Sequence, residues 1–204
     1  MTVTSDDRRL IQKQQRMTLK EFLAYDDGTE KRYELVDGVL VEMGYESTIN
    51  TWIAGFLMFA FGGLGVPHYC LSPKHAIEVR GRYANSRWPD LMVHSEASAA
   101  AIGLRSQACL ELIDPPPLLV LEVVSPGAES EQNYKRDYEQ KPREYADRGV
   151  GEFWRVDPER KWVQIGTLMD GQYEFETFKG EDTIVSPTFP ELTLTAGQVL
   201  AAGL

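Results

Sequence analysis

Cysteine is scarce in this sequence: Cys70 and Cys109 are the two cysteines among 204 residues, and they lie far apart. They therefore indicate neither a disulfide framework nor a zinc site, and they fit a reducing compartment. Long apolar runs are missing too, since no stretch approaches the roughly 18 residues that a transmembrane helix needs. Residues 1–17 contain no apolar core of the kind that a secretory signal requires. We therefore expect a cytoplasmic protein that has no membrane partner.

Positive charge is also in short supply. The 21 lysines and arginines face 31 aspartates and glutamates, which gives a formal net charge of −10 at pH 7. A general polyanion binder is disfavoured, because the mean field of such a protein repels phosphate. A local basic cleft remains compatible with this balance, and so does a site that gathers divalent cations.

The chain has the length and composition of one globular domain. Its hydrophobic content of 43% and charged content of 25% are ordinary for such a protein. Residues 1–16 are polar and mixed in charge, so we expect a frayed tail there and a single domain over 17–204. Repeats, low-complexity tracts and linkers are absent from the sequence.

Strand and helix signals are interspersed along the domain. Two hairpins are predicted over 31–43 and 161–179, each with an Asp-Gly turn between alternating apolar residues. A helix is predicted over 46–63, and a charged helix over 129–150. Pro142 interrupts the charged helix, so we expect a kink or a restart near Lys141. The order of elements predicts an α/β (α+β) domain with a mixed sheet.

An acid lies inside an apolar strand. The stretch "PPPLLVLEVVSP" (115–126) resembles a strand that is buried on both faces, with Glu122 near its middle. An ionised carboxylate is rarely left dry and unpaired, because its desolvation costs several kcal/mol or more. We therefore expect Glu122 to have a cation, several hydrogen-bond donors, a raised pKa or access to a cleft.

Two further acids occur in strand contexts. Asp90 follows Pro89 at the head of "LMV", and Glu34 alternates with Tyr33 and Leu35. Two or three carboxylates with a nearby lysine suit metal-assisted phosphodiester hydrolysis, since Mg²⁺ prefers oxygen ligands and can lower the pKa of a bound water. Acids at strand ends are common, so spacing alone is a weak signal. Paired carboxylates could also perform glycosidase-like acid/base chemistry.

Four motifs carry a resemblance to a known family. The motifs "RYELVDG", "WPDLMV", "LLVLEVVSP" and "KPREYADRGVGEFWRVDP" occur in this order. They resemble a restriction-endonuclease-like family often labelled Uma-two, a branch of the PD-(D/E)-x-K nuclease superfamily. The similarity runs from about residue 17 to the C-terminus. It implies a restriction-endonuclease-like fold, in which helices flank a central mixed sheet and the metal site lies at a splayed strand pair.

The resemblance implies a set of metal ligands for Mg²⁺ or Mn²⁺. Pro89-Asp90 is similar to the PD element, which makes Asp90 a metal ligand. Glu122 is similar to the second acid, and the Val123 carbonyl is a candidate third oxygen. Glu34 matches the upstream acid of the family and is expected to bind the metal directly or through water.

The lysine of the superfamily is displaced in this chain. It normally stands two residues after the second acid, where this sequence has Val124. In the Uma-two family the lysine is thought to come from the following helix, and Lys141 in "QKPREY" matches that position. The resemblance therefore implies that Lys141 positions the attacking water.

These residues lead to two hypotheses of different classes. The first is a metal-dependent endonuclease with DNA as substrate, in which Glu34, Asp90, Glu122 and Lys141 are catalytic. The second is a nuclease-fold binding or regulatory module with little or no catalysis, which the acidic balance favours. Because many relatives in the superfamily pair to cut two strands, the resemblance also allows a homodimer.

Other polar residues are assigned structural roles at this stage. His94 is expected to be a partly exposed or internally satisfied histidine. Two basic groups are expected to be solvated: the first could instead line a phosphate path, and the second has Glu139 and Glu144 interleaved as salt partners. These groups are Lys74, Arg80, Arg82 and Arg87 before Asp90, and Lys135, Arg136, Arg143 and Arg148 on the charged helix.

Overall fold

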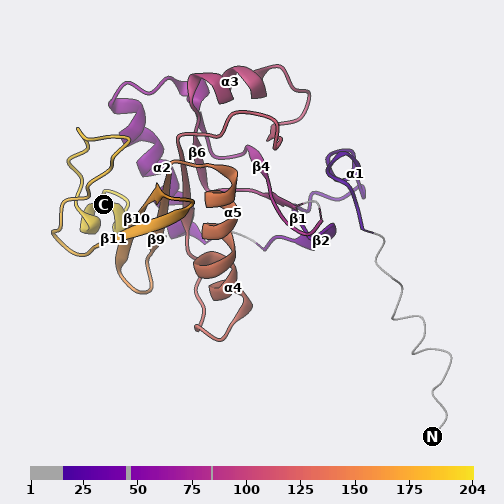
Figure 1. Cartoon of the computed structure of the whole chain (residues 1–204). Helices are drawn as coiled ribbons and strands as arrows, with labels where there is room; N and C mark the ends of the chain where they lie inside the picture. Colours follow the sequence, from indigo (N-terminus) through magenta and orange to yellow (C-terminus); the bar gives the residue numbers. More distant parts are fainter. Residues whose placement is uncertain (1–15, 45–46, 84) are drawn as a thin grey trace, which may run out of the picture.

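The computed structural model describes residues 16–44, 47–83 and 85–204 (Figure 1). Of the tail predicted over 1–16, residues 1–15 lie outside these ranges. Within them, no helix is long and apolar enough to cross a membrane. The cytoplasmic location stays a prediction.

The strands form two sheets. The larger has six strands in the order β11-β10-β9-β8-β6-β3, with β8 and β9 parallel and the remaining pairs antiparallel. Its members are β3 (Leu71–Ser72), β6 (Leu91–Val93), β8 (Leu119–Val123), β9 (Glu152–Asp157), β10 (Trp162–Met169) and β11 (Gln172–Phe178).

The smaller sheet has five strands in the order β2-β1-β5-β4-β7, in which β4 and β7 are parallel. Its members are β1 (Tyr33–Val36), β2 (Val39–Glu42), β4 (Ala76–Val79), β5 (Asn85–Arg87) and β7 (Cys109–Leu110). The predicted class, a mixed α and β domain, is therefore confirmed, but the single central sheet is wrong. Pro89 supplies a physical reason for part of the division. It lacks an N–H for a strand ladder, and it lies where the chain leaves β5 and enters β6 of the other sheet.

Both faces of β8 are covered, as the sequence predicts. Leu119, Leu121 and Val123 pack in a cluster with α2 (Thr48–Gly63) and α6 (Ala196–Leu200). Val120, on the opposite face, packs in a second cluster with residues of α3 (Glu96–Gly103) and α5 (Lys141–Arg148). Because side chains alternate along a strand, Glu122 shares the face of Val120 and points to the side where α5 lies.

The predicted hairpins are confirmed. Both Asp-Gly turns have positive φ at the two central residues, with values of 49° and 76° in the first and 48° and 82° in the second. This geometry matches the twist of the flanking strands and favours the Asp-Gly sequence. The short helix α1 (Leu19–Leu23) begins at a capping box formed by Thr18 and Glu21. Figure 1 shows α1 and the β1–β2 hairpin at one end of the molecule, away from the C-terminus.

The charged helix changes its winding before Lys141. Helix α4 (Gln132–Lys135) continues as a π-helix, η2 (Arg136–Gln140), and α5 begins at Lys141. The restart predicted near Lys141 is thus confirmed. In a π-helix the Asp137 carbonyl would accept a hydrogen bond from the backbone N–H of residue 142, but that residue is a proline and has no N–H. Arg155 Nη1 donates to the Asp137 carbonyl instead, at 3.4 Å.

A 3-10 turn, η1 (His68–Cys70), precedes β3.

Candidate active site

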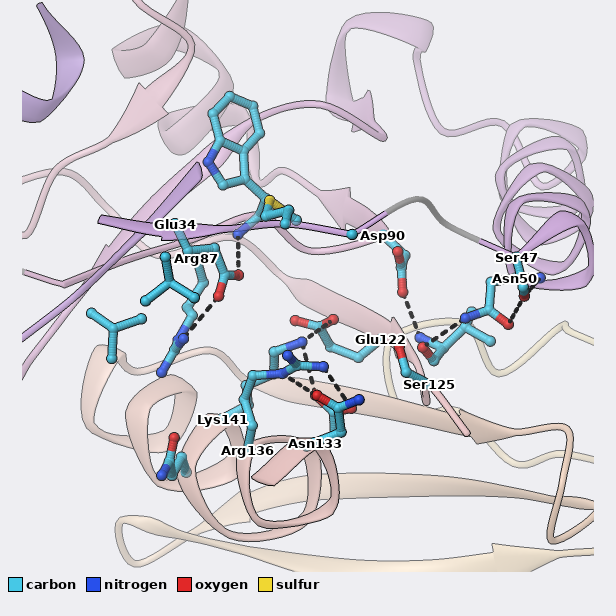
Figure 2. A pocket seen from close by; sticks show the side chains of 18 of the residues that line it. Glu34, Ser47, Asn50, Arg87, Asp90, Glu122, Ser125, Asn133, Arg136 and Lys141 are labelled. Carbon is cyan, nitrogen blue, oxygen red and sulfur yellow. Dashed lines mark hydrogen bonds and ion pairs between the residues drawn. The ribbon is translucent and has the colours of Figure 1, made fainter. Parts of the chain in front are cut away.

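The predicted site residues line one cavity of about 520 Å³. Its wall combines the end of β1 and β2, the Trp88–Asp90 crossover, the end of β8, the start of α2 and the η2–α5 segment. Figure 2 shows Glu122 between the Glu34–Arg87 pair on one side and Asp90 with Asn50 on the other. Lys141 and Arg136 approach from the helical segment below. The residues of this wall that carry the site are Glu34, Asn50, Arg87, Trp88, Asp90, Glu122, Val123, Arg136, Asp137 and Lys141.

Strand pairing brings Asp90 and Glu122 to the same region. Leu91 of β6 pairs with Leu121 of β8 in an antiparallel register, and one further step brings Asp90 level with Glu122. Partners in such a register project to the same face of the sheet. The Asp90 Oδ2 atom accepts a hydrogen bond from the Val123 amide at 2.6 Å, which ties the crossover to β8.

Glu122 is buried but not unpaired. Its Oε2 accepts from Lys141 Nζ at 2.7 Å, and its Oε1 accepts from the Tyr145 hydroxyl at 2.5 Å. Burial raises the pKa of the Glu122 carboxyl, although the Lys141 charge and the two hydrogen bonds act in the opposite direction. Burial and the neighbouring Glu122 charge raise the pKa of Tyr145 well above its usual range, so Tyr145 stays protonated and donates.

Lys141 reaches the site from the first turn of α5. Besides Glu122, its ammonium pairs with Asp137 Oδ1 at 3.1 Å. Burial alone lowers the pKa of Lys141, but the charges of Glu122 and Asp137 outweigh it and raise the pKa above its ordinary value. Lys141 is therefore a fixed cation at neutral pH. Pro142 constrains the adjacent backbone, but the Lys141 side chain still points to Glu122.

Glu34 lies in the same cavity and binds a buried arginine. Its Oε2 accepts from Arg87 Nη1 at 2.9 Å, and its Oε1 accepts from the Trp88 amide at 3.3 Å. Arg87 also forms a two-pronged ion pair with Glu144 of α5, at 2.7 and 2.8 Å. The solvated role expected for Arg87 is wrong, because its guanidinium is paired with two carboxylates and its side chain is 1% exposed. On the charged helix, Arg148 is likewise buried, and it donates to main-chain carbonyls.

Sequence reasoning missed several residues of this site. Tyr145 and Asp137 flank Lys141 at intervals of four residues, which places all three near one helix face, and this spacing was the available signal. Asn50 had no comparable signal. Its side-chain amide donates to the Val123 carbonyl at 3.3 Å, and its carboxamide oxygen accepts from Ser47 at 2.7 Å at the start of α2.

The oxygen donors suit a hard divalent cation. Asp90 and Glu122 supply carboxylates and Val123 a main-chain carbonyl, and Mg²⁺ usually takes one or two carboxylates and completes its shell with water. Glu34 lies in the same cavity, with its carboxylate paired to Arg87. In the part of the chain that the structure describes, no three or more histidine, cysteine, aspartate or glutamate side chains are grouped so that they could hold a metal ion. Asp90, Glu122 and the Val123 carbonyl are the candidate donors, and metal binding by Glu34, directly or through water, stays a prediction.

Comparison with known proteins agrees with the fold. A family model, Uma2, described as "Putative restriction endonuclease", matches residues 19–197. A solved protein from Anabaena variabilis, described as a "putative nuclease belonging to DUF820", is similar with a TM-score of 0.69 and 18% identity. The alignment covers 92% of this chain and 99% of that one. No curated protein matches the chain. The structural similarity shows a shared fold, which confirms the predicted nuclease fold.

Proposed function

The chain belongs to the Uma2 family, and from this premise we propose that it is a metal-dependent endonuclease that hydrolyses phosphodiester bonds in DNA. The observation that carries the proposal is the contact between Lys141 and Glu122 in a cavity that Asp90 also lines. Two acids and a lysine from separate elements thereby converge at one place. Structural ion pairs alone do not explain why the trio opens onto a cavity.

Each residue has a role that follows from its surroundings. Asp90, Glu122 and the Val123 carbonyl would hold Mg²⁺ or Mn²⁺, which supplies a Lewis acid and lowers the pKa of a coordinated water. The Lys141 ammonium orients the attacking water and stabilises the negative charge that develops on the phosphate. Because its pKa is raised, Lys141 acts as a cation and not as a proton acceptor. Glu34 and Arg87 fix the strand end beside the cavity.

A cleavage assay tests the proposal. Supercoiled plasmid, linear duplex and single-stranded DNA are incubated with the protein and Mg²⁺ or Mn²⁺, and products are resolved on gels. We expect strand cleavage that EDTA abolishes, and a fall of at least about 100-fold for Asp90→Asn, Glu122→Gln and Lys141→Met. Glu181→Gln, an exposed change outside the cavity, serves as the control. Cleavage that survives Asp90→Asn and Lys141→Met would refute the assignment.

A second candidate is a nuclease-fold binding or regulatory module. It is favoured by the completeness of the internal pairing, since both oxygens of Glu122 and both of Glu34 accept hydrogen bonds from protein groups. Absence of cleavage under either metal ion in the same assay, together with DNA binding measured by gel shift, would favour the module. The homodimer that the resemblance allows stays a prediction.

A further inference from the structure

We propose that the cavity accepts one strand of DNA at a time, and that Arg136 at its mouth contacts the phosphate of the entering nucleotide. This inference rests on the proposed nuclease function and names the form of the substrate. It depends on three observations: which cation of the cavity is accessible, what the opposite wall is made of, and how deep the acids lie.

Arg136 is the accessible cation of this cavity. Three basic side chains line it within the described residues, and their exposed fractions are 1% for Arg87, 8% for Lys141 and 30% for Arg136. Arg136 donates to the neighbouring Asp137 through Nε at 3.0 Å and Nη2 at 3.3 Å, which fixes its guanidinium. A fixed guanidinium at a cavity mouth suits a phosphate, because its planar fork matches the phosphate oxygens.

The wall formed by the end of β1, β2 and the crossover is partly apolar. It contains Val36, Val41 and Met43 together with Trp88, and the Val41 side chain is exposed. Figure 2 shows Glu34 of β1 above Glu122, on the side opposite to Lys141 and Arg136. Aromatic and apolar side chains of this kind pack against the faces of unstacked bases. A nucleotide placed between the two walls would have its base on one and its phosphate on the other.

The depth of the carboxylates favours an unpaired strand. Glu122 is 3% exposed, so a scissile phosphate must enter the cavity to approach it. A volume of about 520 Å³ lies within the roughly 300–1,000 Å³ range of small-molecule pockets, which suits a nucleotide better than a stacked duplex. A duplex-binding protein also neutralises several phosphates over a wide surface. The excess of 31 acidic over 21 basic residues disfavours such a footprint.

A binding experiment tests the inference separately from catalysis. Fluorescence anisotropy is measured with a labelled 12-nucleotide single strand and with the blunt duplex of the same sequence, in EDTA and in Ca²⁺, over a series of salt concentrations. We expect the single strand to bind at least about tenfold more tightly than the duplex. For Arg136→Gln we expect about tenfold weaker single-strand binding, and a slope of log K against log salt that is smaller by about 0.7.

Two further variants make the result specific. Arg136→Lys keeps the charge and is expected to retain most of the salt slope. Lys135→Gln removes the same charge from an adjacent, exposed position outside the cavity and is expected to leave binding unchanged. Thermal unfolding of each variant shows whether it is folded.

The outcomes separate the two proposals. A duplex that binds as tightly as the single strand, or an Arg136→Gln variant that binds as the wild type does, overturns the inference even if the protein cleaves DNA. Binding as predicted, without cleavage under any divalent ion, overturns the proposed nuclease function and leaves the inference standing. A protein that binds neither DNA form overturns both.

Discussion

Glu122 lies in a strand in which every residue is buried, and its carboxylate is tolerated because two donors from one helix meet it. Removing one member of such a buried group is costly, since the remaining charge is left uncompensated. The Lys141 ammonium is shared between Glu122 and Asp137, so these three residues act as one unit. Two predictions about the free energy of unfolding follow at this scale. The first concerns Asp137 of this unit, and the second concerns the buried His94.

Replacing Asp137 by asparagine should destabilise the fold in a pH-dependent way. Burial raises the pKa of Asp137, but the charges of Lys141 and Arg136 outweigh it and lower the pKa below its ordinary value. A lowered pKa contributes stability above the ordinary pKa and loses it as pH falls through the folded value. We expect Asp137→Asn to lower the unfolding free energy by about 3 kcal/mol at pH 7, and by less below pH 4.

Urea unfolding of both proteins at pH 7 and pH 3.5 measures this effect. Asp147→Asn, an exposed change on α5, is the matched control and should cost less than about 0.5 kcal/mol. An equal loss at the two pH values would show that the Asp137 charge is not the cause.

His94 should make the protein sensitive to mild acid. Its ring contacts His75 at 2.9 Å and Ser98 at 3.2 Å, and it is 2% exposed. Burial and the neighbouring His75 lower its pKa from 6.5 to about 4. Its stabilising contribution is therefore present above pH 6.5 and is lost as pH falls toward 4. We expect His94 to account for a loss of about 3 kcal/mol over this interval.

Chemical denaturation at pH 7.5 and pH 4.5 tests this expectation. The wild type should lose more stability between these values than His94→Gln does, whereas His68→Gln, at an exposed histidine, should behave as the wild type. A parallel decline in wild type and His94→Gln would contradict the assignment. The sequence-based expectation of an internally satisfied histidine agrees with its contacts.

Single residues differ in how far the sequence predicts them. Asp90, Glu122 and Lys141 could be selected because motif and context singled them out, and the structure places all three on one cavity. For Tyr145 the four-residue spacing from Lys141 was the available signal, whereas the role of Arg87 could not be predicted, because its burial depends on how α5 packs over β5. Lys141 was predicted as a site residue, but its contact with Glu122 could not be predicted, because that contact depends on how the helix before Lys141 is wound.

At the scale of elements, that winding is the least regular feature of the site. Pro142 predicts an interruption, and the structure resolves it as a π-helix over Arg136–Gln140. Such bulges are frequent at functional sites, because one extra residue rotates the side chains on one side relative to the other. The proline predicts where the helix is interrupted, but it does not predict whether the interruption is a kink or a π-turn. That outcome depends on Arg155, which is distant in sequence and donates to the Asp137 carbonyl.

Replacing Pro142 by alanine should therefore lower the cleavage activity. Alanine supplies an N–H, so the segment can wind as a regular α-helix, which turns Arg136 and Asp137 by about 100° relative to Lys141. We expect at least about tenfold lower cleavage in a variant that still unfolds cooperatively. Pro115→Ala, at an exposed proline, is the control for the change in chain flexibility. Full activity in Pro142→Ala would show that the π-turn does not depend on the proline.

At the scale of the whole molecule, the sequence predicted a mixed α/β domain but not two sheets. Local patterns identify the hairpins, whereas the division depends on long-range pairing, such as that of Leu35 in β1 with Ser86 in β5. The cavity lies where the two sheets and the η2–α5 segment meet, so its residues come from distant parts of the chain. Among the described residues, the basic side chains that line the cavity are the buried Arg87 and Lys141 and the half-buried Arg136, in a chain whose net charge is −10.

Calorimetric titration with Mn²⁺ tests most directly whether this cavity is a metal-dependent site. The account predicts one Mn²⁺ bound per chain by the wild type and by the control Glu181→Gln, with affinity reduced at least about tenfold in Asp90→Asn and in Glu122→Gln. Absence of Mn²⁺ binding in the wild type, or unchanged binding in Asp90→Asn, would contradict it.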